Sequence, residues 1–153
     1  PNNLFGSYDN FHLENSHVIP AIIRKMHEAN LNGEDIVLWG DGSPLREFTY
    51  SNDLANILLF LLENYDAPEP INVGNTQEIS IKDVAEMIAE ISDFKGKIIW
   101  DTSKPMGQYR KPSDNSKLIK LGWKQEYYTD LRKSLTETYK WVILNYPNIR
   151  GMI

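Results

Sequence analysis

The chain has 153 residues, of which 41% are hydrophobic and 24% charged, close to the average for a globular domain. Its 21 acidic residues outnumber its 16 basic ones, so the broad basic surface of a nucleic-acid-binding protein is not expected. The absence of cysteine excludes disulfides, thiolate zinc sites and a cysteine nucleophile within the chain. No apolar run approaches the ~20 residues of a membrane span, so we expect no membrane partner and a cytoplasmic location.

The first third of the chain is predicted to form a helix followed by two extended segments. Ser16 is a candidate cap for the helix, Pro20 falls in its first turns, and residues 30–33 end it. Residues 36–39 are then predicted to form a short buried strand. A cluster of turn-forming residues follows, and residues 46–50 form a second extended stretch.

A helix is predicted next, capped by Ser51 or Asp53, and its residues 57–62 are six apolar residues in succession. A helix that is apolar on all sides is buried on all sides. Either it is simply the central helix of the domain, or residues outside this chain cover part of it. We expect helix 54–62 to keep a face that this chain leaves bare.

The second half alternates strands and helices, which predicts an α/β fold. In order, we expect a strand at 71–74, a helix capped by Ser80 with Asp83 and ended by Gly96, a strand at 97–100, a polar loop at 101–116, a helix at 117–121 and a final helix capped by Thr129.

The sequence lacks the local motifs of a complete nicotinamide enzyme. It contains no G-x-G-x-x-G, no P-loop, no G-x-S-x-G, no H-E-x-x-H and no tyrosine followed four residues later by lysine. No metal site is expected, and His27, in mid-helix, is predicted to lie on the surface. His17 lies at a helix N-terminus, where the dipole favours the neutral imidazole. It is either an acid/base residue or a hydrated polar ring.

Basic residues offer a second candidate site, for an anionic ligand. Arginine binds phosphate through its planar fork, whereas lysine supplies a point charge. Together with Trp39 beside a glycine turn, these residues could hold a nucleotide diphosphate; separately they are solvated surface charges, and Trp39 is a core residue. The basic residues are Arg24, Lys25, Arg46, Lys104, Arg110 and Lys111.

Several short motifs relate the chain to known proteins more specifically than composition and periodicity do. They lie in residues 1–6, 9–11, 16–21, 39–48, 53–55, 71–74, 103–107, 110–111 and 121–123. Together they resemble the GDP-L-fucose synthase family of extended short-chain dehydrogenases/reductases, from residue 1 to about residue 145. The stretch Ser16-His17-Val18-Ile19-Pro20 with residues 9–11 is the most particular to that family. The motifs at 46–48 and 121–123 are shared by many nucleotide-sugar epimerases and dehydratases.

The resemblance implies an enzyme that uses NADP(H) and a GDP-sugar, GDP-4-keto-6-deoxy-D-mannose. The family epimerises the sugar at C3 and C5 and then transfers hydride to C4. Its glycine-rich loop, catalytic Ser and Tyr-x-x-x-Lys, and epimerising Cys all precede the segment equivalent to residue 1. Residues 1–153 are therefore expected to be one C-terminal, nucleotide-sugar-binding domain, with segments that complete a Rossmann sheet. We expect this part to be inactive alone, and the whole protein to be a homodimer.

The resemblance also assigns roles to individual residues. It implies that His17 is catalytic in the proton transfers and contacts the cofactor, and that Lys25, Trp39 and Arg46 bind the GDP-sugar. Asn2 stands where the family has Thr, and Met106 where it often has Asp. The cofactor-binding residues implied are Pro1, Asn2, Asn3, Leu4 and His17.

Two other functions remain open at this point. One is another nucleotide-sugar epimerase or dehydratase of the same extended family. The other is a noncatalytic binding module that uses the bare face of helix 54–62 as a docking surface.

Overall fold

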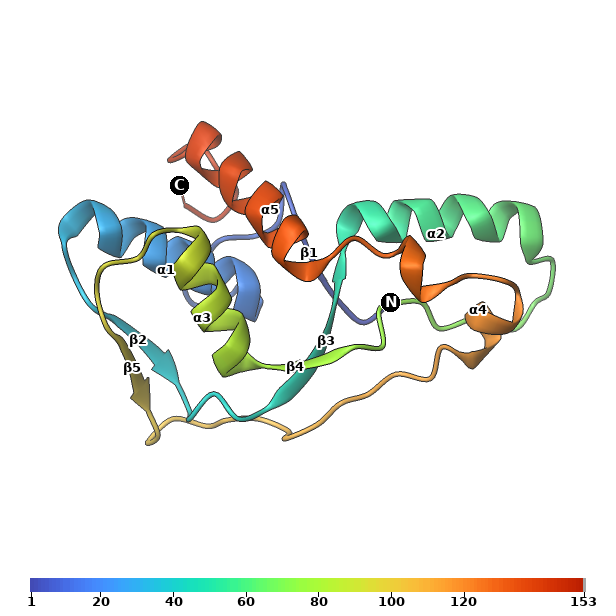
Figure 1. Cartoon of the computed structure of the whole chain (residues 1–153), viewed down its shortest axis with the longest axis horizontal. Helices are drawn as coiled ribbons and strands as arrows, with labels where there is room; N and C mark the ends of the chain where they lie inside the picture. Colours follow the sequence, from blue (N-terminus) through green and yellow to red (C-terminus); the bar gives the residue numbers. More distant parts are fainter. Residues whose placement is uncertain (153) are drawn as a thin grey trace.

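The computed structural model describes residues 1–152 and has an α/β fold, as the sequence predicts (Figure 1). Parallel pairing joins β1 to β3 and β2 to β5, and β4 runs antiparallel to β3, so the strands form one sheet of order β1-β3-β4 and a separate pair. The elements are β1 (Asn3–Phe5), α1 (Val18–Asn32), β2 (Ile36–Trp39), β3 (Leu45–Tyr50), α2 (Ser51–Asn64), β4 (Glu78–Ser80), α3 (Ile81–Ile91), β5 (Ile98–Asp101), α4 (Ser116–Lys120), a 3-10 turn (Gln125–Tyr127) and α5 (Leu131–Asn145).

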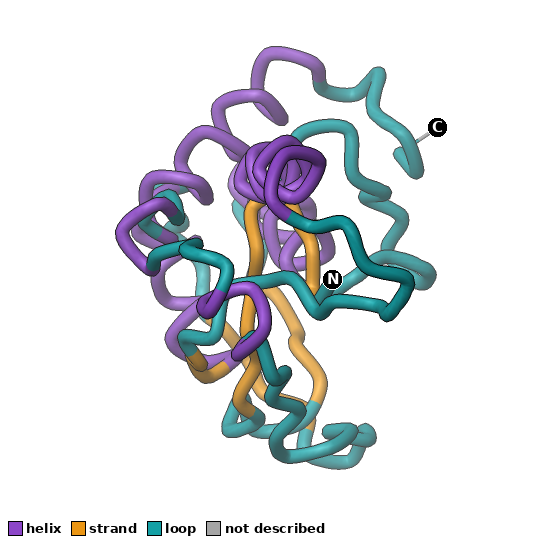
Figure 2. Tube along the Cα trace, turned by 90° about the vertical axis from the view of Figure 1, so that its right-hand side faces the viewer, coloured by secondary structure: helices purple, strands orange, loops and turns teal. Residues whose placement is uncertain are grey.

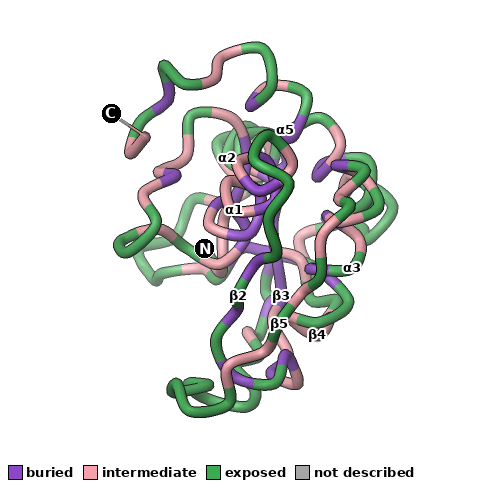
Figure 3. Tube along the Cα trace, turned by 90° about the vertical axis from the view of Figure 1, so that its left-hand side faces the viewer, coloured by how far each residue is buried: buried purple, intermediate pink, exposed green. Residues whose placement is uncertain are grey.

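The elements gather at two ends of an elongated molecule, with β1, β3 and β4 between them (Figure 1). The larger hydrophobic core packs α1, α3 and α5 against the strands. A smaller core at the other end joins α2 to α4 through Ile57, Val73, Leu118 and Trp123. The strands run through the middle of the molecule (Figure 2), and buried residues concentrate there and along α1 (Figure 3). No helix within residues 1–152 is long and apolar enough to cross a membrane.

Helix α1 begins and ends almost where the sequence predicts, but its cap differs. The N-cap is His17, whose side chain makes no capping bond, and the Ser16 hydroxyl is buried without a hydrogen-bond partner. The prediction that Ser16 caps this helix is therefore wrong. Gly33 ends the helix in the left-handed conformation (φ 72°), which glycine adopts at little cost.

The predicted caps of α2 and α5 are wrong for a common reason. The carboxylate of Asp53 accepts hydrogen bonds from the amide (3.0 Å) and hydroxyl (2.7 Å) of Thr129, so each residue satisfies the other across the fold. The N-cap of α2 is Tyr50, and that of α5 is Asp130, which accepts from the Lys133 amide at 3.0 Å. Local sequence shows both candidate capping groups but not that they bind one another.

Helix α3 starts as predicted, because the Ser80 hydroxyl accepts from the Asp83 amide at 3.0 Å. It ends at Ile91, earlier than the predicted Gly96.

The predicted strand at 71–74 is absent: the Val73 carbonyl accepts one hydrogen bond from the Asn2 amide (3.2 Å), and no ladder forms. The sequence analysis missed β1 and β4, whose three residues each are too few to show a strand periodicity.

The bare face predicted for helix 54–62 is confirmed on α2. Ile57 is fully buried against the smaller core, whereas Leu59 is 63% and Leu62 82% exposed. Leu58 lies on the same open side. Helix α2 therefore buries one face within this chain and leaves the other apolar and uncovered.

His27 is buried, so the prediction that it lies on the surface is wrong. Its ring packs edge-on against Tyr146, with ring centroids 4.6 Å apart, and against Tyr139 at 6.0 Å. Burial lowers the pKa of His27, although the charge of neighbouring Glu28 opposes the shift. The long final helix folds back onto α1, an arrangement that residue spacing in α1 does not reveal.

The two faces of α2 should respond oppositely to substitution. Ile57→Ala removes a fully buried side chain and should cost about 2–5 kcal/mol of unfolding free energy. Leu59→Gln and Leu62→Gln, at exposed positions, should change it by less than about 0.5 kcal/mol. Urea denaturation measures all three. Equal losses at residues 57 and 59 would show that the second face is covered in solution.

Stability should fall as the solution is acidified, through His27. The unfolded chain takes up its proton near the ordinary histidine pKa of about 6.5, whereas the buried ring resists protonation, so the unfolded state gains protons first. The contribution is present above that pH and is lost below it, with a slope of at most about 1.4 kcal/mol per pH unit. Urea midpoints from pH 7.5 to 5.5 should fall less in His27→Gln than in the parent. Parallel curves would contradict this.

Candidate functional site

A hollow of about 760 Å³, larger than the two beside Trp39, lies beside β1. All five residues to which the sequence assigns cofactor contact line it: Pro1, Asn2, Asn3, Leu4 and His17. Lys111 and Arg150 add positive charge to its wall, and Asp9 and Asp114 add negative charge. Within residues 1–152 only β3 pairs with β1, so the other edge of β1 is unpaired by any strand.

Two smaller hollows, of about 220 and 210 Å³, flank Trp39 at the end of β2. Both are lined by Val18, Trp39 and Ile81; Lys25 borders the first and Arg46 the second. The indole of Trp39 is 65% exposed because side chains alternate along β2 and every second one faces outward. Residues 36–39 thus form a strand buried on one face only, and the interpretation of Trp39 as core is wrong.

Lys25 and Arg24, adjacent on α1, have different surroundings. The ammonium of Lys25 donates to the Val37 carbonyl at 2.8 Å, and partial burial lowers the pKa of this lysine. Arg24 donates to the Phe11 carbonyl (3.0 Å) and the Gly151 carbonyl (2.7 Å), and it lines neither Trp39 hollow. Lys25 therefore borders the first Trp39 hollow, whereas Arg24 holds the segments around Phe11 and Gly151 to α1.

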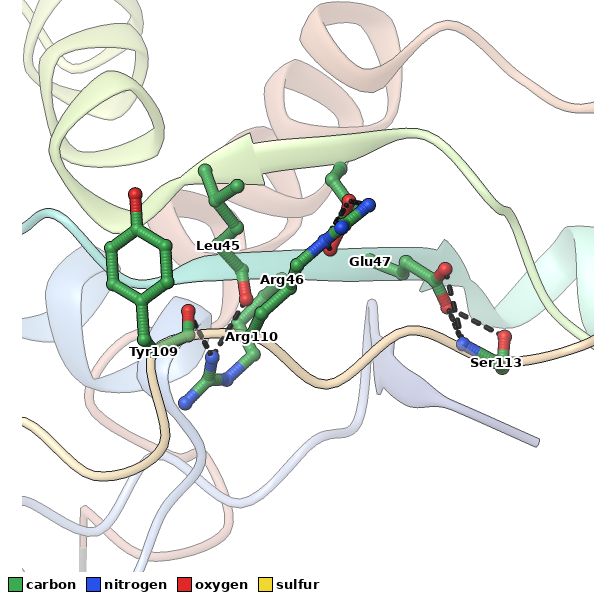
Figure 4. A network of polar contacts seen from close by, with 7 residues as sticks. Leu45, Arg46, Glu47, Tyr109, Arg110 and Ser113 are labelled. Atoms are coloured by element: carbon green, nitrogen blue, oxygen red, sulfur yellow. Dashed lines mark hydrogen bonds and ion pairs between the residues drawn. The ribbon is translucent and has the colours of Figure 1, made fainter.

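Arg46 borders the second hollow and also holds the long loop (Figure 4). Its guanidinium donates to the carbonyls of Leu45 (2.6 Å), Gln108 (2.7 Å) and Tyr109 (3.5 Å). These contacts use part of a five-donor fork, so further N–H groups remain to meet an anion. Arg110, in contrast, forms an ion pair with Glu78 at 2.5 Å, and its hydrogen bonds lower the pKa of that carboxyl.

The buried carboxylate of Glu47 secures the loop on the other side (Figure 4). It accepts from the hydroxyl of Ser113 at 2.5 Å, from the amide of the same residue at 3.1 Å, and from the Asn2 side chain at 3.0 Å. Asn2 in turn accepts from the Thr49 hydroxyl at 2.5 Å. One glutamate therefore joins β3, the loop and the segment that lines the hollow beside β1.

The structure brings most, but not all, of the predicted site residues together. Lys25, Trp39 and Arg46 surround one place, whereas His17 lines the separate hollow beside β1. The two places share no lining residue; His17 borders the one and the next residue, Val18, borders the other. Glu47 is not among the residues predicted from the sequence. A charged residue at an inward position of a six-residue strand is the pattern that indicates a buried polar contact there.

Known proteins resemble this chain in sequence and in structure. The sequence profile of the NAD dependent epimerase/dehydratase family matches residues 1–74. The probable GDP-L-fucose synthase 1 of Oryza sativa subsp. japonica is 49% identical over 146 residues, covering 95% of this chain and 44% of the relative. Nearly the whole chain is thus similar to GDP-L-fucose synthases, and its first 74 residues match the NAD dependent epimerase/dehydratase family.

Other relatives agree with this similarity. The GDP-L-fucose synthase of Escherichia coli (strain K12) is 40% identical, covering 99% of this chain and half of the relative. The crystal structure of a GDP-L-fucose synthetase from Naegleria fowleri bound to NADP matches with a TM-score of 0.92 and 41% identity, over 97% of this chain and 46% of that one. The chain thus spans about half the length of the relatives it matches, and its partial sheet is consistent with part of a Rossmann-like domain.

Glu47→Gln should loosen the loop. The amide keeps the shape but lacks the charge, and its NH2 group meets donors of Ser113 and Asn2. We expect a loss of about 1–3 kcal/mol in unfolding free energy and faster hydrogen exchange at the Ser113 amide. The exposed Glu63 on α2 supplies the matched control, Glu63→Gln. Unchanged exchange at Ser113 would mean that Glu47 does not hold the loop.

Proposed function

We propose that this chain is the nucleotide-sugar-binding part of a GDP-L-fucose synthase. The whole protein would convert GDP-4-keto-6-deoxy-D-mannose to GDP-L-fucose by 3,5-epimerisation and NADPH-dependent 4-reduction. The similarity to several GDP-L-fucose synthases supports the substrate, and the NADP named for the Naegleria fowleri structure supports the cofactor. Residues 1–153 would be the C-terminal domain of that protein.

The exposed Trp39 carries the proposal. Its indole stands between two hollows that hold a lysine and an arginine, Lys25 and Arg46. A nucleobase stacks on an exposed aromatic face with about 1–3 kcal/mol, and a guanidinium fork matches phosphate oxygens. An aromatic platform flanked by cations suits a nucleoside diphosphate better than it suits a neutral metabolite.

The hollow beside β1 suits the reacting end of the ligand and part of NADP(H). Its volume is within the range of small-molecule sites, and backbone groups on the unpaired edge of β1 can bind a ligand. Pro1, Asn2, Asn3, Leu4 and His17 would hold the cofactor there. When bound, NADPH supplies the hydride.

His17 would move protons in the epimerisation. A 4-keto group acidifies the protons at C3 and C5, because the carbanion that their loss creates is delocalised onto the carbonyl oxygen. An imidazole can return such a proton near neutral pH, and delivery to the opposite face inverts the carbon. The exposed His17 ring at the wall of the hollow meets the requirement for access.

This chain alone should not turn over substrate, since no Tyr-x-x-x-Lys pair or dinucleotide-binding loop occurs in it. Mixing the chain with NADPH and the keto sugar should therefore leave NADPH absorbance unchanged. We also propose a homodimeric whole protein in the cytoplasm. Turnover by the isolated chain would contradict the proposal that the Tyr-x-x-x-Lys pair and the dinucleotide-binding loop lie in another part of the whole protein.

A second candidate is binding of a UDP-sugar. The chain matches a UDP-N-acetylglucosamine 4-epimerase of Methanobrevibacter ruminantium M1, in complex with UDP-N-acetylmuramic acid, with a TM-score of 0.77 and 27% identity. Stronger binding of UDP than of GDP would favour it. A noncatalytic module that docks through the bare face of α2 would bind neither nucleotide.

Titration of the chain with GDP tests the proposed function. Trp39→Ala should weaken GDP binding by roughly five- to a hundredfold, the equivalent of one lost base stack. Trp39→Phe keeps an aromatic face and should retain most of the affinity. Leu62→Ala, at the other end of the molecule, controls for general effects. If the parent chain does not bind GDP in calorimetry, the proposed function fails.

A further inference from the structure

One cation beside the Trp39 hollows has no role so far. The ammonium of Lys104 lies over the Trp39 ring, 6.0 Å from its centroid. That distance is the outer limit of cation–π contacts, so the contact is weak and easily exchanged. Within residues 1–152, Lys104 forms no ion pair with a carboxylate.

The position of Lys104 follows from the pairing of β2 with β5. In that parallel register Trp39 lies opposite Asp101, and the Gly40 amide donates to the Asp101 carbonyl at 2.9 Å. The chain then turns: the carboxylate of Asp101 accepts from the amide (3.0 Å) and hydroxyl (2.6 Å) of Ser103, which lower its pKa. This turn directs Lys104 back over the indole.

The rest of the loop is fixed at several points. The side chain of Met106 lies against Gly40, where an added Cβ would come within 2.7 Å of its Cγ. Arg46 holds the carbonyls of Gln108 and Tyr109. Since the backbone is held on both sides of Lys104, the side chain of this lysine can change partner without a movement of the loop.

We propose that Lys104 is a phosphate-binding residue that rests on Trp39 until a nucleotide arrives. The proposal depends on the proposed function, because it needs a nucleoside diphosphate at Trp39. An incoming base competes with the ammonium for the ring, and the displaced ammonium, on its flexible stem, binds a phosphate oxygen of the same ligand. Lys104 thus disfavours a ligand with a ring alone and favours one with a ring and phosphates.

Comparing GDP with guanosine separates the two effects of Lys104. In Lys104→Gln, GDP should bind about ten- to a hundredfold more weakly, as expected for a lost charge-assisted hydrogen bond. Guanosine should bind equally well or up to severalfold more tightly, because its competitor for the ring is gone. Lys104→Arg should retain GDP binding, and the exposed Lys97→Gln should change neither ligand.

Several results would overturn the proposal. Equal GDP affinity in the parent and in Lys104→Gln would show that the lysine does not reach phosphate. Equal weakening of GDP and guanosine would show that it only shapes the hollow. If the parent binds neither ligand, the proposed function has failed; if it binds GDP and Lys104→Gln binds it as well, only the Lys104 proposal has failed. Urea midpoints of each variant verify folding.

Discussion

Two neighbouring residues of β3 attach the long loop to the fold, and the geometry of the site depends on them. Successive side chains of a strand point to opposite faces, so Arg46 and Glu47 can hold two different parts of one loop. Arg46 binds the carbonyls of Gln108 and Tyr109, and Glu47 binds Ser113. The segment between β5 and α4 has no regular structure, yet its backbone is hydrogen-bonded at both faces of the strand.

This attachment connects the loop to the surroundings of both kinds of hollow. Glu47 also binds Asn2, so the loop and the wall of the cavity beside β1 are held as one unit. On the other face, Arg46 and the β2–β5 pair form the surroundings of Trp39. Val18, which follows His17 in the chain, borders both Trp39 hollows, whereas His17 lines the cavity beside β1.

Two surfaces that this chain leaves uncovered agree with its similarity to proteins about twice its length. Helix α2 has a bare apolar face, and β1 has an edge that no described strand pairs. In folded proteins such surfaces are usually covered by other elements or by a partner. The chain spans about half of the relatives that it matches. The proposed nucleotide-sugar binding is argued from the similarity to GDP-L-fucose synthases and from the exposed Trp39 beside Lys25 and Arg46.

The sequence by itself determined the α/β class, most helices, the capping of α3 by Ser80 and the bare apolar face of α2, because these follow from residue patterns within a few positions. Its motifs also resemble those of the GDP-L-fucose synthases that the chain matches, and they predict a binding role for Lys25, Trp39 and Arg46. Only the tertiary structure decided that Asp53 binds Thr129, that His27 is buried under α5 and that Glu47 holds Ser113. Each of these pairs joins residues more than 60 positions apart, and no local pattern records which distant polar group will satisfy a buried one.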